Sequence, residues 1–88
     1  MGDASQEGAG SPLRAVVEVM VRALVDHPDA VQVTESERRG VIVLQLSTAP
    51  GDMGKIIGRQ GRTAAALRTL VSVTAEKHGK RAQLDIRD

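Results

Sequence analysis

The sequence predicts a small α+β domain in which three helices pack on one face of a three-stranded sheet. Three observations lead to this class. The chain has 88 residues, which is enough for one modest core. Apolar residues recur at helical spacing in the longer segments and follow strand patterns in the shorter ones. The segments come in the order α-β-β-α-α-β, and helices gathered on one face of the sheet would enclose a single core.

The first ten residues are expected to lie outside this core. Residues 1–10, MGDASQEGAG, are small, polar and rich in glycine. Such a segment cannot bury enough apolar surface to offset the entropy that it would lose on ordering, so we expect a disordered tail. The single domain should then span residues 11–88.

A first helix is expected to begin at Ser11 and Pro12. Serine suits the N-cap, and proline suits the first helical position because its missing N–H would be unpaired there. Pro28 disfavours helical geometry in the residue before it, so the helix should end near His27. The expected apolar face follows three- and four-residue spacing and comprises Leu13, Val16, Val17, Met20 and Leu24.

Two strands are expected next, paired as an antiparallel hairpin. Residues 31–35, VQVTE, alternate between apolar and polar, whereas residues 41–47, VIVLQLS, are nearly all apolar and rich in β-branched side chains. The polar segment between them ends in Gly40 and supplies the turn. We expect Ile42, Leu44 and Leu46 to face the core.

Two further helices are expected after the hairpin. Asp52 is placed to cap a very short helix over residues 53–57, and Gly58 is suited to end it. Gly61 precedes a long helix over residues 62–78. The expected buried face of the long helix comprises Ala64, Leu67, Leu70, Val71 and either Thr74 or Ala75.

The final element is expected to be a strand over residues 80–87. Lys77 and His78 stand near the negative end of the long helix, where a positive charge is favourable, and Gly79 ends that helix. In the strand, Ala82, Leu84 and Ile86 should point inward.

Charge is distributed unevenly, although the net charge is only +1. Residues 1–37 hold seven acids and two arginines, whereas residues 53–81 hold seven basic residues and one acid. A basic segment of this kind is either a solvated helix face or a surface for a polyanion, and the glycines within it favour the polyanion.

The composition excludes several classes of function. The chain has no cysteine, which excludes disulfides, cysteine-bound zinc and thiol nucleophiles. It has no aromatic residue, so any nucleic acid would be bound without stacking platforms. We interpret His27 and His78 as surface histidines, and with no third metal ligand and no nucleophile–base pair we expect no metal, cofactor or catalysis. Without a signal peptide or a long apolar run, we expect a cytoplasmic protein that does not enter membranes.

The most informative segment is residues 54–68, GKIIGRQGRTAAALR, with three glycines, four cations and no acid. A P-loop is excluded because Ala49 stands where it needs glycine and Ile56 where it needs a hydroxyl. A dinucleotide-binding fingerprint is excluded because the glycines do not directly follow a strand. A Gly-x-x-Gly turn between two helices remains, at residues 58–61. Free amides at the start of the second helix would suit a phosphate.

The residues IIGRQGRTAAAL resemble the signature of a KH domain, and the order of elements resembles the type II KH fold found in bacteria. A chain of this size with GKIIGRQGRTA is similar to the small bacterial single-KH-domain RNA-binding proteins of the KhpA kind. The resemblance covers residues 13–87. A lone GxxG is a weak signal, since residues 51–54 also match it, but the longer motif between two helices is specific.

The resemblance implies a non-enzymatic RNA chaperone or post-transcriptional regulator. In such a protein about four nucleotides of single-stranded RNA lie in a groove, with the backbone clamped at the GXXG loop. Either Ile56 or Ile57 would line the groove, while the other joins the core. Arg68 lies two turns further on and could face away. The expected RNA-binding residues are Lys55, Ile57, Gly58, Arg59, Gln60, Gly61 and Arg62.

The resemblance also implies homodimers, and heterodimers with a larger KH-containing partner of the KhpB (Jag-like) kind. Ala66, Thr69 and Val73 form a second face of the long helix and are the candidate dimer contacts, although such residues also simply favour a helix. An alternative function follows, in which the chain is a KH-fold adaptor that acts mainly by dimerising. An adaptor should tolerate aspartate at Arg59 and Gln60, whereas an RNA clamp should not.

Overall fold

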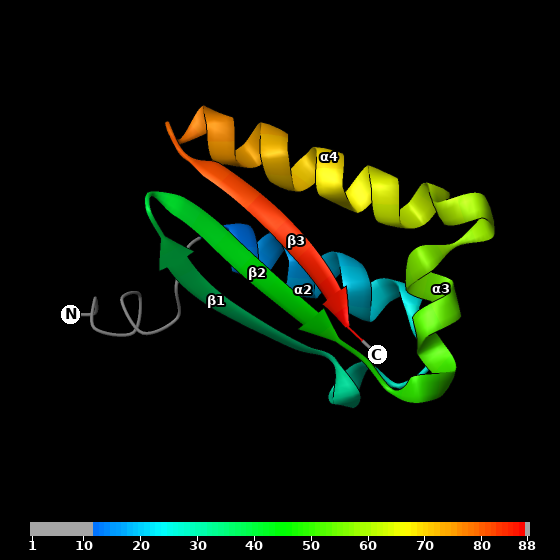
Figure 1. The fold of residues 1–88 in the computed structure, drawn as a ribbon. Helices are drawn as coiled ribbons and strands as arrows, with labels where there is room; N and C mark the ends of the chain where they lie inside the picture. The colour runs from blue at the N-terminus through cyan, green and yellow to red at the C-terminus, as the bar shows by residue number, and fades with distance from the viewer. Residues whose placement is uncertain (1–11, 88) are drawn as a thin grey trace.

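A computed structural model describes residues 12–87 and confirms the expected order of elements (Figure 1). The tail expected at residues 1–10 and the cap expected at Ser11 lie outside the described residues. The helices are α2 (Pro12–Leu24), α3 (Met53–Ile57) and α4 (Arg62–Lys77). The strands are β1 (Gln32–Arg38), β2 (Val41–Ser47) and β3 (Arg81–Arg87), and short 3-10 turns occupy Pro28–Ala30, Pro50–Asp52 and Arg59–Gly61.

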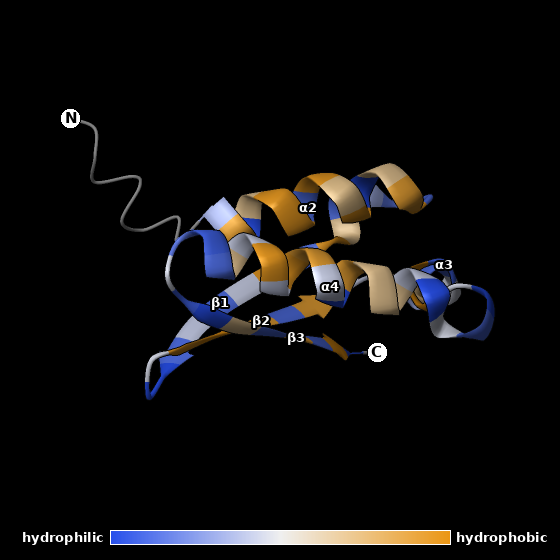
Figure 2. Ribbon diagram, turned by 90° about the horizontal axis from the view of Figure 1, so that it is seen from above, coloured by the Kyte–Doolittle hydropathy of each residue, from blue (hydrophilic) through white to orange (hydrophobic). Residues whose placement is uncertain are grey.

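The sheet is mixed and has β2 in the middle. β1 pairs with β2 in antiparallel orientation, and β3 pairs with the other side of β2 in parallel orientation. α2 and α4 lie side by side over one face, while no helix of residues 12–87 covers the other face (Figure 2). The structure therefore confirms an α+β fold with helices on one face of a three-stranded sheet.

The core lies between the sheet and the helices. Ile42, Leu44 and Leu46 point into it from β2, as expected, and Leu84 is buried in β3 with Ala82 and Ile86 partly buried beside it. Complete burial of an aliphatic side chain of this size contributes about 1.5–3 kcal/mol to stability. The helices contribute Leu13, Val17, Val21, Met53, Ile56, Ala64, Leu67, Val71 and Ala75.

The buried faces of the two long helices are narrower than expected. In α2, Val21 is fully buried, whereas Val16 and Leu24 are 38% and 42% exposed. In α4, Leu70 is 45% exposed although its neighbour Val71 is buried. Successive helical residues point about 100° apart, so Val16 and Leu70, each next to a buried residue, lie at the margin of the buried face. Leu24 lies on the same side of the helix as Val17 but is the last residue of α2. The expectation was therefore wrong for Val16, Leu24 and Leu70, and it missed Val21.

Two element boundaries differ from the expectation by about three residues, and the others by no more than one. α2 ends at Leu24 instead of near His27. β1 continues to Arg38, which leaves a turn of only two residues, Arg39 and Gly40. Both have positive φ, 53° and 82°, which is typical of a type I′ turn, whose twist matches that of the strands.

Candidate nucleic-acid interface

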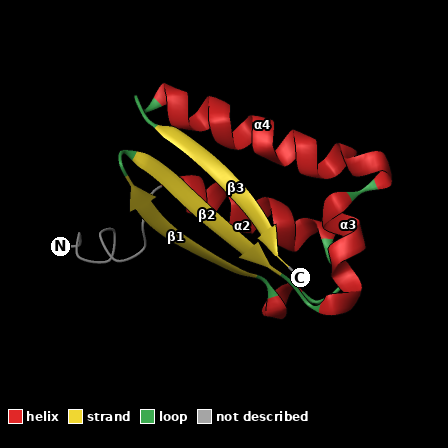
Figure 3. Ribbon diagram, in the orientation of Figure 1, coloured by secondary structure: helices red, strands yellow, loops and turns green. Residues whose placement is uncertain are grey.

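The Gly-x-x-Gly segment forms the tight turn that joins α3 to α4 (Figure 3). Gly58 has φ 76° and ψ 175°, a conformation that essentially only glycine adopts. Its N–H donates to the carbonyl of Gly54 at 2.8 Å and ends α3. Gly61 has φ 74° and ψ 12°, in the left-handed region, and α4 begins after it. Both glycines therefore provide the chain reversal that the sequence predicts.

The surroundings of the two glycines differ. A Cβ added to Gly58 would lie 2.7 Å from the Cβ of Thr63 and 3.0 Å from its backbone nitrogen. A Cβ added to Gly61 would meet no atom of the described residues within 4 Å. Gly58 is therefore required by packing inside the turn, whereas the outer side of Gly61 is open to an approaching ligand.

Gln60, at the tip of the turn, is also left-handed, with φ 57° and ψ 26°. Sequence reasoning assigned positive φ only to the glycines and missed this residue. A side chain with a Cβ costs roughly 1–2 kcal/mol in this region. Strain of this kind occurs preferentially at functional sites, where the surrounding structure maintains it.

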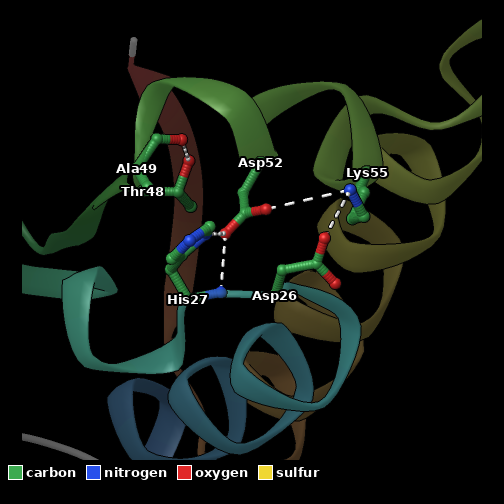
Figure 4. Close-up of polar contacts among 6 residues, drawn as sticks. All are labelled: Asp26, His27, Thr48, Ala49, Asp52 and Lys55. Carbon is green, nitrogen blue, oxygen red and sulfur yellow. Dashed lines mark hydrogen bonds and ion pairs between the residues drawn. The ribbon is translucent and has the colours of Figure 1, made fainter.

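The cations around the turn fall into two groups. Arg59 and Arg62 are exposed, and neither forms an ion pair with an acid of residues 12–87. Lys55 differs, because its Nζ lies 3.2 Å from a carboxylate oxygen of Asp26 and 3.8 Å from one of Asp52 (Figure 4). The two arginines are therefore available to an anion, whereas Lys55 is held between two acids.

The surface near the turn has an apolar and a basic component. Ile56 is fully buried and Ile57 is 44% exposed, so Ile57 is the isoleucine available to a ligand. Further along α4, Nε of Arg68 donates to the carbonyl oxygen of Leu84 at 3.4 Å. This contact places a guanidinium over the border between α4 and the edge strand β3.

Asp52 is a buried acid that anchors the start of α3 (Figure 4). It occupies the expected N-cap position, but its carboxylate does not cap the helix. Its Oδ2 accepts a hydrogen bond from the backbone N–H of His27 at 2.9 Å and lies 3.2 Å from Nδ1 of the His27 ring. Burial raises the pKa of Asp52, but the backbone N–H groups of His27 and Asp26, together with the His27 ring, outweigh it and lower the pKa overall.

Sequence reasoning missed this network. His27 is a surface histidine, as interpreted, with its side chain 68% exposed, but its ring also contacts Asp52, which the sequence did not predict. Asp52 and His27 are 25 positions apart, and an acid before a short helix is typical of an N-cap. No local pattern distinguishes the two roles. The network fixes the start of α3 to the segment that follows α2, and α3 carries the turn.

The outer surfaces of α2 and α4 expose apolar side chains. The expected contact residues Ala66, Thr69 and Val73 are all exposed on α4. Leu70 of α4 and Val19 of α2 are exposed as well, and the two helices lie side by side (Figure 2). This outer apolar surface, defined by Val19, Leu70 and Val73, has no function in packing the core.

Within residues 12–87, no cluster of three or more His, Cys, Asp or Glu side chains is suited to hold a metal ion. No helix in the same range is long and apolar enough to span a membrane.

Comparison with known proteins supplies a family for this architecture. A family model described as the KhpA/KhpB KH domain matches residues 14–86. A protein of Halalkalibacterium halodurans named "RNA-binding protein KhpA" is 49% identical over 76 residues, which cover 86% of this chain and all of that protein. Proteins of the same name are 45% identical in Aquifex aeolicus, over 86% of this chain and 96% of that one, and 47% identical in Treponema pallidum, over 83% and 91%.

Proposed function

Because the chain belongs to the KhpA/KhpB KH-domain family, we propose that it binds single-stranded RNA and clamps the RNA backbone at residues 58–61. One observation carries the proposal. The outer side of Gly61 is free of neighbouring atoms among the described residues, directly where α4 begins. KH domains clamp nucleic-acid backbone at this loop.

The start of α4 is suited to a phosphate. No side chain caps its first amides, and the positive end of the helix dipole lies there. A phosphate can approach over Gly61, since no side chain intervenes. Arg59 and Arg62 can then add charge from the rim, and their planar guanidinium groups match phosphate oxygens in pairs.

The bases would be held without stacking. Ile57 offers an exposed aliphatic surface next to the turn, and the chain has no aromatic residue. About four nucleotides fit a site of this kind, recognised by apolar contact and hydrogen bonds. The ion pairs of Lys55 with Asp26 and Asp52 compete with an RNA contact by Lys55, so its part in binding should be smaller than that of Arg59.

In the cell, we infer that the chain acts without catalysis as a cytoplasmic RNA chaperone or post-transcriptional regulator. We also infer homodimers, or heterodimers with a larger KH-containing partner of the KhpB (Jag-like) kind. The names of the relatives support RNA binding, and the description of the family joins KhpA with KhpB.

A second candidate function is an adaptor that works mainly by dimerising. The observation that favours it is the outer apolar surface, in which Val19 and Val73 are 68% and 56% exposed. The two functions make opposite predictions for the Gly-x-x-Gly turn, because an adaptor does not need Arg59 or Gln60.

The test is a salt titration of binding to a short single-stranded RNA, with wild type compared to the Arg59→Asp/Gln60→Asp variant. Wild-type affinity should fall with salt, with a slope of log K against log salt of about −0.7 for each phosphate contact. The double variant puts two anions at the phosphate position and should lose binding, while circular dichroism shows an unchanged fold.

The matched control is Lys77→Asp/His78→Asp, which changes the net charge equally at the far end of α4 and should retain short-RNA binding. If the folded Arg59→Asp/Gln60→Asp variant binds as wild type does, the clamp is refuted and the adaptor function is favoured.

A further inference from the structure

The uncovered face of the sheet carries a second concentration of positive charge. Arg38 at the end of β1 and Arg81 at the start of β3 are both in register with Val41 of the central strand. They therefore flank Val41 on the same face, roughly 10 Å apart, since adjacent strands are about 4.8 Å apart. Arg39 in the hairpin turn and Lys80 before β3 lie at the same end of the sheet, and all four cations are exposed.

These four cations have no acidic partner within residues 12–87. The register also places Gln45 and Gln83 on the uncovered face, with Asp85 as the acid beside them. Positive charge therefore predominates at the hairpin end, and the neighbouring side chains can donate and accept hydrogen bonds.

The same face is hollowed. A cavity of about 430 Å³ is lined by residues of all three strands, among them Arg38, Arg39 and Arg87. A second cavity of about 380 Å³ lies between α4 and the start of β3, with the cations Lys80 and Arg81 and one acid, Glu76, in its lining. Both cavities include Val41 and Gln83 in their linings, so they adjoin around the start of β3.

The chemistry of this face favours a polyanion over a protein. Protein interfaces are anchored by aromatic or large apolar side chains, and here the apolar floor consists of the half-buried Val41 and Val43. Arginine presents a planar fork of donors that matches phosphate. Gln45 and Gln83 can bond to base edges or 2′-hydroxyls.

We propose that the sheet face around Arg38, Arg39 and Arg81 is a second RNA-binding surface, which takes the part of a single strand that extends beyond the clamp. The proposal rests on the proposed function. α4 has 16 residues and is therefore about 24 Å long; the clamp lies at its start, and the second cavity borders its later half at Ser72 and Glu76. A strand that follows the border of α4 and β3 passes Arg68, reaches Arg81 and turns around the start of β3 to Arg38.

RNA length separates the two surfaces experimentally. The clamp takes about four nucleotides, so a tetranucleotide cannot reach the sheet face, whereas a strand of about twelve can. Binding of both lengths is measured by fluorescence anisotropy at several salt concentrations for wild type and Arg38→Gln/Arg81→Gln. Arg14→Gln/Arg22→Gln, on α2, is the control of equal charge, and Arg59→Asp/Gln60→Asp reports on the clamp.

The Arg38→Gln/Arg81→Gln variant should bind the tetranucleotide like wild type. It should bind the longer strand about tenfold more weakly, because two charge contacts are lost and each is screened by solvent at an exposed site. Its salt slope for the longer strand should be smaller in magnitude by about 1.4, because two phosphate contacts are removed. The α2 control should bind both lengths nearly as wild type does.

Three outcomes would overturn the proposal. In the first, the Arg38→Gln/Arg81→Gln variant binds the longer strand with the affinity and salt slope of wild type. In the second, the variant binds the tetranucleotide and the longer strand with equally reduced affinity, which indicates a general electrostatic effect. The third is unchanged RNA binding with loss of binding to a polyglutamate peptide, which assigns the face to an acidic protein. If wild type binds neither RNA, the proposed function itself fails, a result distinct from these three.

Discussion

Gly58 and Thr63 are packed against each other so closely that the turn between α3 and α4 admits no side chain at residue 58. A Cβ there would lie 2.7 Å from the Cβ of Thr63 and closer still to its Oγ1. The backbone of Gly58 is also in a region that is essentially limited to glycine. The geometry of the turn that we propose as the RNA clamp therefore depends on the contact between these two residues.

Alanine at the two glycines of the turn should have unequal effects on stability. Gly61→Ala should lower the free energy of unfolding by about 1–2 kcal/mol. This is the cost of placing a residue with a Cβ in the left-handed region, and the added Cβ would clash with no neighbouring atom. Gly58→Ala should cost at least about 3 kcal/mol, since overpacking against Thr63 adds to the backbone strain. Urea unfolding followed by circular dichroism measures both. Equal losses would mean that Thr63 moves aside freely.

The left-handed conformation of Gln60 predicts a stabilising substitution. Asparagine tolerates this conformation better than glutamine does, so Gln60→Asn should raise the free energy of unfolding by about 0.5–1 kcal/mol. Arg59→Asn is the matched control, because Arg59 is not among the residues with positive φ. A gain in both variants, or in neither, would show that strain at Gln60 is not the cause.

Asp52 should make stability depend on pH in the acid range. Its pKa in the folded protein is below the ordinary value of 3.8, so the fold favours the ionised carboxylate. The stabilisation is fully present above the ordinary pKa and is lost as the pH falls through the folded pKa. Asp52→Asn should be less stable than wild type at neutral pH, and the difference should shrink below about pH 3.

Urea unfolding of wild type and Asp52→Asn, from about pH 7 to about pH 2, measures this difference. Asp29→Asn is the control, since it removes an exposed carboxylate from the connection between α2 and β1, which also holds His27, the partner of Asp52. A difference between wild type and Asp52→Asn that stays constant with pH would contradict the assignment, because the lost contact would then not depend on the charge.

The elements were predictable where one residue type decides the local conformation. Gly58, Gly61 and Gly79 all have positive φ and stand at helix boundaries, so α3 and the start of α4 agree with the expectation. The apolar run of β2, rich in β-branched residues, likewise predicts its strand correctly. Its alternate residues are buried in the central strand of the sheet.

The remaining features depend on tertiary structure, which local patterns do not encode. The contact of Asp52 with His27 joins distant segments, and the strain at Gln60 arises from closing the turn. Helical periodicity gives the direction of a buried face but not its width, so Val16 and Leu70 were wrongly assigned to the core. In the candidate site, the sequence predicts the glycine turn and the arginines beside it. It does not predict the ion pairs of Lys55 with Asp26 and Asp52.

The outer apolar surface predicts how the chain self-associates. Val73 is 56% exposed, and a glutamate there would place a charge within the outer apolar surface and oppose its burial against a second copy. Light scattering should show a dimeric mass for wild type and a monomeric mass for Val73→Glu. Gln83→Glu, an equal charge change on the uncovered sheet face, should remain dimeric.

The same variants separate self-association from the clamp. Val73 lies on α4 outside the Gly-x-x-Gly turn, so Val73→Glu should bind a tetranucleotide with wild-type affinity per chain. Loss of both dimer and short-RNA binding would show that the clamp needs two copies. An unchanged dimeric mass in Val73→Glu would exclude this surface as the homodimer contact, and the outer apolar surface would then be available to a different KH-containing partner.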